Sequence, residues 1–212
     1  MEKIPDCFIS WAYKQRAELV RRQAREEKIS PNEIFLGFTR HTPTVITDGP
    51  AGLNGSIKGV GFIPRPEFME EIIEEYMKHI NGPMDKSYSQ RGLEILDRLV
   101  WADGKEEIFD FSLLGTLELA KKHTWRNLHF NNRATLLFYQ PPAISFEVRC
   151  VAQIEESGPV QKYLNAQHDI YHGPNVNSWD KRPAYVFHIE EIFDNSAGRK
   201  GFGTRVFPEK EV

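Results

Sequence analysis

The chain has 212 residues, of which 40% are hydrophobic and 12% aromatic. This composition supports one substantial buried core and excludes intrinsic disorder as the default. The formal net charge of −3 gives no overall attraction to nucleic acid or to an anionic membrane surface, so an anion-binding site must be local.

The cysteines and the N-terminus bear on the cellular compartment. Cys7 and Cys150 lie far apart and form neither a C-x-x-C pair nor a zinc-binding spacing, which fits a reducing environment. The first residues, MEKIPDCFISW, lack the charged and apolar regions of a signal peptide, and no window approaches the roughly 20 apolar residues of a membrane helix. We expect a soluble cytoplasmic protein.

The first quarter of the chain predicts a helix, two short strands and a loop. Residues 12–29 are good helix formers but mostly charged, which favours a surface helix. IFLGF (34–38) and TPTVIT (42–47) read as strands around a turn. The loop DGPAGLNGS (48–56) contains three glycines but lacks the lysine of a phosphate-binding P-loop, so a flexible turn is the better interpretation.

Residues 66–100 predict a helical hairpin. In PEFMEEIIEEYMKHINGP the apolar residues recur at helical spacing, Pro66 opens the helix and Gly82 closes it. A second helix is expected at about 88–100. We expect a single domain over 1–212 in which 66–100 is a helical insertion.

The segment from 106 to 133 contains the most basic stretch of the sequence. EEIFDFSLLG (106–115) predicts a strand, after which Thr116 is expected to begin a helix. On a continuous helix, one face would carry Lys122, Arg126, His129 and Arg133. This stripe is either an anion site or a solvated face partly paired by Glu118, four residues before Lys122.

The C-terminal half predicts a strand meander. ATLLFY (134–139) is apolar at nearly every position and is expected to be covered on both faces. AISFEVRCVAQI (143–154) alternates over its whole length, a short helix follows at about 159–166, and RPAYVFHIEEIF (182–193) supplies another strand. The fold class expected is α+β, mainly β, with a small antiparallel barrel.

The order of these segments resembles a known family, the pyridoxamine 5'-phosphate oxidase-like FMN-binding split barrels. The residues that carry the resemblance are Arg126-Asn127-Leu128, then Asn131-Asn132-Arg133, and then the strands ATLLFY, ISFEVRCVAQI and RPAYVFHIEEIFD. The likeness covers about residues 106–196. It implies an antiparallel split β-barrel with surrounding helices.

The resemblance also implies a function. It implies an FMN-dependent reductase or oxidase acting on a small substrate, with FMN at the interface of a homodimer and the flavin ring performing the redox step. The cofactor-binding residues carried over from the family pattern are Ser112, Lys122, Thr124, Arg126, Asn127 and Arg133. The resemblance does not identify catalytic residues.

Two alternatives stay open at this stage. His168 and His172 stand four residues apart, the spacing with which one helix face binds a metal, and Asp169 or His188 would complete such a site. Histidines of a substrate pocket are the competing interpretation. A non-catalytic flavin- or haem-binding module of the same barrel is the second alternative, because a fold does not fix a function.

Overall fold

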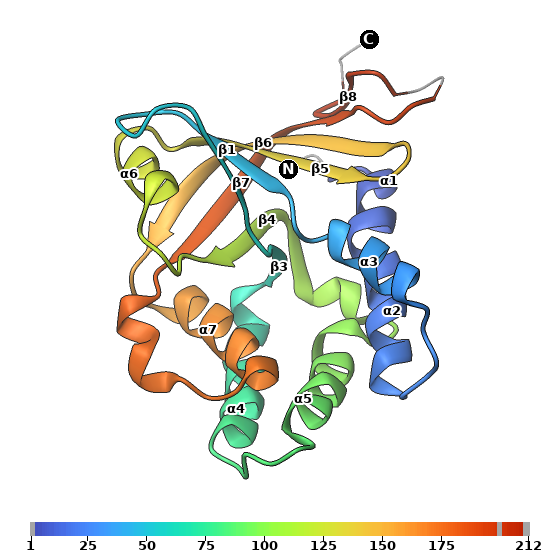
Figure 1. The fold of residues 1–212 in the computed structure, drawn as a ribbon, viewed down its shortest axis with the longest axis vertical. Coiled ribbons are helices and arrows are strands. Elements are labelled where there is room, and N and C mark those ends of the chain that lie inside the picture. The colour runs from blue at the N-terminus through green and yellow to red at the C-terminus, as the bar shows by residue number, and fades with distance from the viewer. Residues whose placement is uncertain (1–2, 199–200, 210–212) are drawn as a thin grey trace.

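The protein is a mixed α+β structure in this computed structural model, which describes residues 3–198 and 201–209 (Figure 1). The α-helices are α1 (Asp6–Ile9), α2 (Gln15–Ala24), α3 (Pro31–Thr39), α4 (Pro66–Ile80), α5 (Tyr88–Leu96), α6 (His123–Phe130) and α7 (Pro159–His172). The strands are β1 (Thr44–Thr47), β2 (Asn54–Ile57), β3 (Gly61–Pro64), β4 (Phe109–Leu117), β5 (Arg133–Gln140), β6 (Ile144–Glu155), β7 (Ala184–Asp194) and β8 (Thr204–Phe207). Short π-helical turns (Ser10–Lys14 and Asp97–Trp101) and 3-10 helices (Lys105–Ile108 and Val176–Lys181) complete the chain.

The strands form one antiparallel sheet in the order β2-β1-β5-β6-β7-β4-β3, and β8 pairs with β7. In the part of the chain that the structure describes, β2 and β3 are the two ends of this order, so the sheet is not closed. The predicted fold class, an α+β split barrel with surrounding helices, is confirmed.

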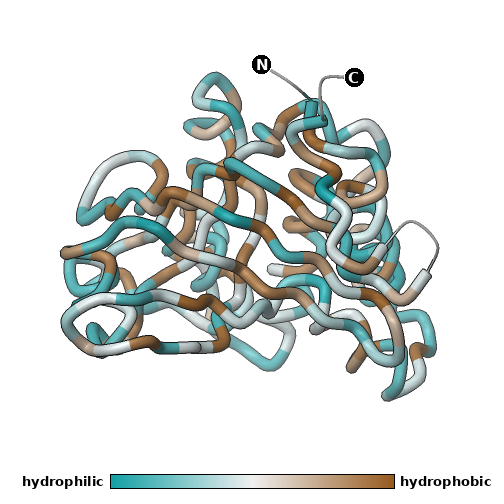
Figure 2. Tube along the Cα trace, turned by 90° about the horizontal axis from the view of Figure 1, so that it is seen from above, coloured by the Kyte–Doolittle hydropathy of each residue, from teal (hydrophilic) through white to brown (hydrophobic). Residues whose placement is uncertain are grey.

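The long strands β6 and β7 form the centre of the sheet. They pair from Phe146 opposite Asp194 to Glu155 opposite Ala184. Hydrophobic and hydrophilic positions interleave along the strands (Figure 2), because alternate side chains point to opposite faces. The expectation that 134–139 is covered on both faces is wrong, since β5 also alternates, and its outward Leu137 and Tyr139 are exposed in this chain.

Helices α4, α5 and α7 gather on one side of the sheet (Figure 1). The helix predicted to open at Pro66 and close at Gly82 is confirmed as α4, and the helix predicted at about 88–100 as α5 with the π-helical turn Asp97–Trp101 after it. Both lie between β3 and β4 in the sequence. A Cβ atom at Gly92 of α5 would stand 1.9 Å from the Ile170 carbonyl oxygen of α7, so only glycine permits this close crossing. Helix α7 runs six residues beyond the predicted 166 and therefore includes His168 and His172.

The surface helix predicted at 12–29 is confirmed over Gln15–Ala24 (α2), where only Ala17 and Val20 are buried. The helical segment that precedes α2 is part of the core. It begins at Asp6, ahead of the charged stretch, and buries Phe8, Trp11 and Tyr13. The indole N–H of Trp11 donates to Oε1 of Gln140 at 3.1 Å and so connects this segment to β5. No helix within residues 3–198 and 201–209 has both the length and the hydropathy needed to cross a membrane.

The predicted strand at 34–38 is wrong, because these residues belong to α3. Ser30 and Glu33 form a capping box, in which the Ser30 hydroxyl accepts from the Glu33 N–H and the Glu33 carboxylate accepts from the Ser30 N–H. Pro31 occupies the first helical position. These local signals outweigh the strand propensity of IFLGF.

Three further boundaries differ from the prediction. Thr116 does not begin a helix, because β4 continues to Leu117 and pairs with β7, and α6 begins only at His123. Arg133 is the first residue of β5, so the predicted helical stripe ends with His129. The predicted loop 48–56 contributes its end to β2, which pairs with the confirmed strand β1.

Candidate functional site

Two of the six predicted cofactor-binding residues are buried in α6 and fasten the neighbouring loop. Asn127 accepts the Ala51 N–H at 2.8 Å and donates to the Gly52 carbonyl at 2.7 Å. The Thr124 hydroxyl lies 2.9 Å from that of Ser56 and accepts from the Asn54 amide at 3.0 Å. Both side chains therefore hold the 48–56 segment against α6.

The other four predicted residues are distributed over three elements. Lys122 and Arg126 are exposed at the start and on the surface of α6, and neither forms an ion pair with a residue in 3–198 or 201–209. Arg133, on β5, pairs with Glu190 at 2.9 Å. Ser112, on β4, donates to Asp110 at 2.5 Å. The structure brings Lys122, Thr124, Arg126 and Asn127 together and places Ser112 and Arg133 elsewhere.

The N-terminus of α6 is electropositive. No side chain caps this helix, and its first turn contains no acidic residue. Lys121 and Lys122 precede it, although cations are unfavourable beside the positive end of a helix dipole. Lys121 has a left-handed φ of 50°, rare for a non-glycine residue, and its ammonium lies 4.8 Å from the centre of the Trp125 ring. Free N–H groups and nearby cations are the partners that a phosphate requires.

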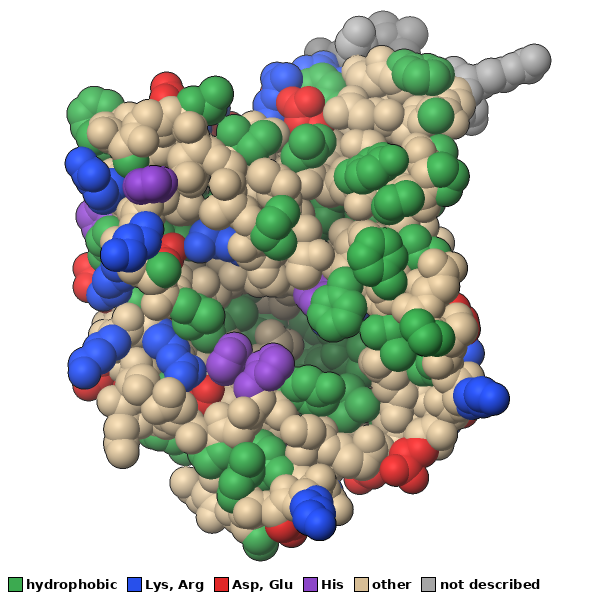
Figure 3. All heavy atoms as spheres, viewed as in Figure 1, with side chains coloured by type: hydrophobic (Ala, Val, Ile, Leu, Met, Phe, Trp, Pro, Cys, Tyr) green, Lys and Arg blue, Asp and Glu red, His purple; other side chains and the backbone are tan. Residues whose placement is uncertain are grey.

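A cleft of about 690 Å³ opens beside this helix, between α2, α3, α5, α7 and the β2, β3 and β4 strands. We call it the central cleft. Figure 3 shows it as a hollow in the middle of one face, with histidine and hydrophobic side chains at its edge. Residues 116–120, which lead from β4 toward α6, form part of its lining. Its volume lies within the roughly 300–1,000 Å³ of small-molecule and cofactor sites.

A buried ion pair lies on the wall of the central cleft. Glu118 accepts from the Lys58 ammonium and from the Tyr185 hydroxyl, each at 2.9 Å, and from the N–H groups of Ala120 and Lys121, each at 2.7 Å. Burial acts to raise the pKa of Glu118, but these hydrogen bonds outweigh it and lower the pKa. The sequence-based pairing of Glu118 with Lys122 is wrong, because Glu118 is not on a helix.

Two histidines of α7 also line the cleft. The rings of His168 and His172 are 4.7 Å apart, and His168 Nδ1 lies 3.0 Å from the Asp169 carboxylate. Because an ionised carboxylate only accepts, Nδ1 is the donor and Nε2 of a neutral His168 is free to accept from a ligand. Burial, and then the neighbouring His168, lower the pKa of His172.

Asp169, the proposed third ligand of a metal site with His168 and His172, is not available to a metal. Asp169 is fully buried, and its carboxylate accepts from His168, Arg182, Trp179 and the Asn175 N–H. His188 lies on β7 with its ring 3.2 Å from Gln153. Within the described ranges, no three His, Cys, Asp or Glu side chains are grouped as metal ligands.

Sequence reasoning missed three residues of the cleft. Arg16 comes from α2, His41 follows α3, and Lys58 connects β2 to β3. Burial, followed by the charge of Arg16, lowers the pKa of His41 to about 3, so this histidine is neutral at pH 7. The Ser30–Glu33 capping box was the one local signal that would have placed His41 after a helix.

Comparison with known proteins identifies similar structures but no sequence relatives. No family model matches the chain, and no curated protein matches it. HupZ of Group A Streptococcus is 13% identical, with a TM-score of 0.47, over 81% of this chain and 97% of HupZ. An F420 reductase is 14% identical, with a TM-score of 0.42, over 72% of this chain and 88% of its own. A putative pyridoxamine 5'-phosphate oxidase of Listeria innocua is 10% identical, with a TM-score of 0.43, over 78% of this chain and 98% of its own.

Proposed function

We propose that the protein binds FMN and is an oxidoreductase acting on a small substrate. The observation that carries this proposal is the course of the chain after β4: residues 116–120 line the central cleft, and Lys121 and Lys122 then lead directly into α6. A flavin nucleotide has an apolar ring and an anionic phosphate, and it therefore needs a roomy pocket adjoining a cationic group. The cleft and the α6 N-terminus supply these two features side by side.

The phosphate is assigned to the start of α6. Lys122 and Arg126 have no carboxylate partner among the described residues, so their charges are available to a dianion. The buried Thr124 and Asn127 side chains keep the neighbouring loop in position. Ser112 bonds Asp110 within β4 and Arg133 pairs with Glu190 of β7, so both are left out of this assignment.

The flavin, when bound, supplies the hydride or electron transfer, and the chain supplies binding and orientation. The lining of the cleft is largely apolar, which excludes water from a ring placed there. The His168 Nε2 and the Lys58 ammonium line the cleft and are among the polar groups available to orient a substrate. Consumption of reduced nicotinamide by FMN-loaded protein would establish an enzyme, and binding without turnover would indicate a carrier or sensor.

The Arg126→Ala substitution is expected to weaken FMN binding by about tenfold or more, equivalent to about 1.4 kcal/mol, because one cationic phosphate partner is removed. Binding is measured by the visible flavin spectrum retained after gel filtration and by titration calorimetry. The matched control is Arg98→Ala, an exposed arginine paired with Glu75 outside the cleft. Equal affinity of Arg126→Ala and wild type would contradict the phosphate assignment, and a protein that retains no FMN would contradict the function itself.

We also propose that the protein is a homodimer with the flavin at its interface. Four large apolar side chains lie exposed at the mouth of the central cleft, namely Phe38, Ile57, Leu119 and Tyr171. Exposed apolar side chains gathered around one cleft are typical of a surface covered by a partner or a ligand. Light scattering is expected to give the mass of two chains, and Ile57→Glu is expected to shift it toward one. A monomer that carries one FMN per chain would contradict this arrangement.

A further inference from the structure

Arg16 is a cation in the central cleft without an acidic partner. It lies on α2 and lines the cleft, and it forms no hydrogen bond or ion pair with any residue in 3–198 or 201–209. Its guanidinium carbon lies 5.4 Å from the centre of the Trp101 ring, a cation–π contact that holds the side chain in place. Arg16 is partly buried, and a partly buried cation without a counter-charge is unfavourable, so a ligand anion would stabilise this arrangement.

Arg16 keeps its charge at neutral pH. Burial, and then the charge of Arg40 at the end of α3, lower the pKa of Arg16 to about 10. Arg40 does not line the cleft, and its Nε is buried without a hydrogen-bond partner among the described residues. The region around Arg16 is therefore positive, and no carboxylate among the described residues pairs with Arg16.

Of the Lys and Arg side chains that line the cleft, one is left without an acidic partner. Lys58 and Glu118 neutralise each other at 2.9 Å, and His41 is neutral at pH 7. Arg16 is then the one Lys or Arg side chain of the described lining without an acidic partner. A single unpaired cation matches a monoanion more closely than a phosphate ester, which carries about −1.5 to −2 at pH 7.

The surroundings of Arg16 are apolar. Leu19 and Val20 of α2, Leu96 of α5 and Trp101 line the same cleft. A planar guanidinium forms two parallel hydrogen bonds to a carboxylate, and the neighbouring side chains fit an apolar body attached to it.

We propose that the central cleft binds a small monocarboxylate with an apolar body, and that Arg16 is the anchor for its carboxylate. Binding of the carboxylate at Arg16 does not depend on the proposed function, because the Arg16 site is separate from the start of α6. Only the identification of this molecule as the substrate rests on the proposed function. It thereby names a substrate class for a flavin-dependent reaction. The binding itself requires no flavin.

The test uses benzoate as the probe and benzamide as its neutral analogue of the same shape, in calorimetric titrations of the full-length protein without FMN. Benzoate is expected to bind about tenfold or more tightly than benzamide, because only benzoate neutralises Arg16. Arg16→Gln is expected to abolish this difference by weakening benzoate alone. The matched control is Arg25→Gln, an exposed arginine just beyond the end of the same helix, which is expected to bind both probes as wild type does.

Several outcomes would overturn the inference. These are equal affinity for benzoate and benzamide, no binding of either, unchanged benzoate binding by Arg16→Gln, or displacement of benzoate by an equal concentration of inorganic phosphate. If Arg16→Gln does not fold, Arg16→Lys is used instead. It keeps the charge but removes the paired N–H groups of the guanidinium, and it is expected to bind benzoate more weakly than wild type. Arg126→Ala separates the two proposals, because it is expected to weaken FMN binding and leave benzoate binding unchanged.

Discussion

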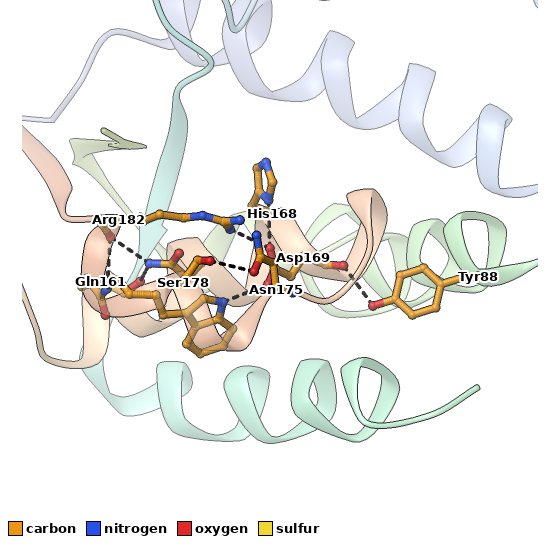
Figure 4. A network of polar contacts seen from close by, with 9 residues as sticks. Tyr88, Gln161, His168, Asp169, Asn175, Ser178 and Arg182 are labelled. Atoms are coloured by element: carbon orange, nitrogen blue, oxygen red, sulfur yellow. Dashed lines mark hydrogen bonds and ion pairs between the residues drawn. The ribbon is translucent and has the colours of Figure 1, made fainter. Parts of the chain in front are cut away.

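Replacing Asp169 by alanine is expected to destabilise the protein by about 3–5 kcal/mol, because it leaves a partly buried Arg182 without its counter-charge. Figure 4 shows the network around this carboxylate. Its Oδ1 accepts from Arg182 at 2.9 Å, and its Oδ2 accepts from the Trp179 indole at 2.8 Å and the Asn175 N–H at 2.7 Å. Asp169 therefore holds the 173–182 connection at three residues, and Gln161 and Asn165 of α7 add hydrogen bonds to the Trp179 and Arg182 carbonyls.

Urea denaturation at pH 7 measures this effect. Asp180→Ala is the matched control, since Asp180 is exposed and lies in the same connection. Asp169→Asn keeps the size of the side chain but removes its charge, so this variant is expected to lose less stability than Asp169→Ala and more than Asp180→Ala. A loss below about 1 kcal/mol in Asp169→Ala, within the range of an ordinary surface hydrogen bond, would show that the network does not stabilise the fold.

Glu118→Gln is expected to destabilise the protein by about 3 kcal/mol at pH 7, because Lys58 is left charged and unpaired beside the cleft. Glu118 is 2% exposed and the Lys58 side chain 13% exposed, so water screens this pair weakly. In the double variant Lys58→Met/Glu118→Gln neither charge remains, and much of the lost stability is expected to return. A double variant no more stable than Glu118→Gln would contradict the assignment of the loss to an unpaired charge.

The same pair predicts a pH dependence. The folded-state pKa of Glu118 is lowered from the ordinary value of 4.5. The contribution of Glu118 to the free energy of unfolding is therefore complete above pH 4.5 and is lost as the pH falls through the folded pKa. Wild type is therefore expected to lose stability below about pH 4.5 more steeply than Glu118→Gln. Urea midpoints at pH 7 and pH 4 measure this difference, with Glu70→Gln, an exposed residue of α4, as the control.

Long periodic segments were predictable from the sequence. Helix α4 buries Met69, Ile72, Tyr76 and Ile80 at the predicted spacing, and the strand predicted at 143–154 is β6 to within one residue at each end. Such segments repeat one local preference many times, so a single periodicity dominates. The short segment IFLGF carries too few residues for its periodicity to decide, and the capping box before it set its structure instead.

The candidate site was predictable only in part. Lys122, Thr124, Arg126 and Asn127 do lie together, because they share one short helix. Arg133 was assigned to the same face on the assumption that the helix continued, but Asn131 leaves the helical conformation and Arg133 enters β5. Whether the residues on α6 contact a phosphate stays a prediction that Arg126→Ala tests.

The sequence by itself determined the fold class, through the order of a helical pair followed by alternating strands, and it located the basic helix α6. Only the tertiary structure decided the central cleft, because Arg16, Lys58, Glu118 and His168 come from four segments far apart in the chain. Pairing of charges depends on distance in space rather than on spacing in sequence. Glu118 therefore neutralises Lys58, sixty residues away, and not Lys122, while Arg16 is left with a charge that no described residue balances.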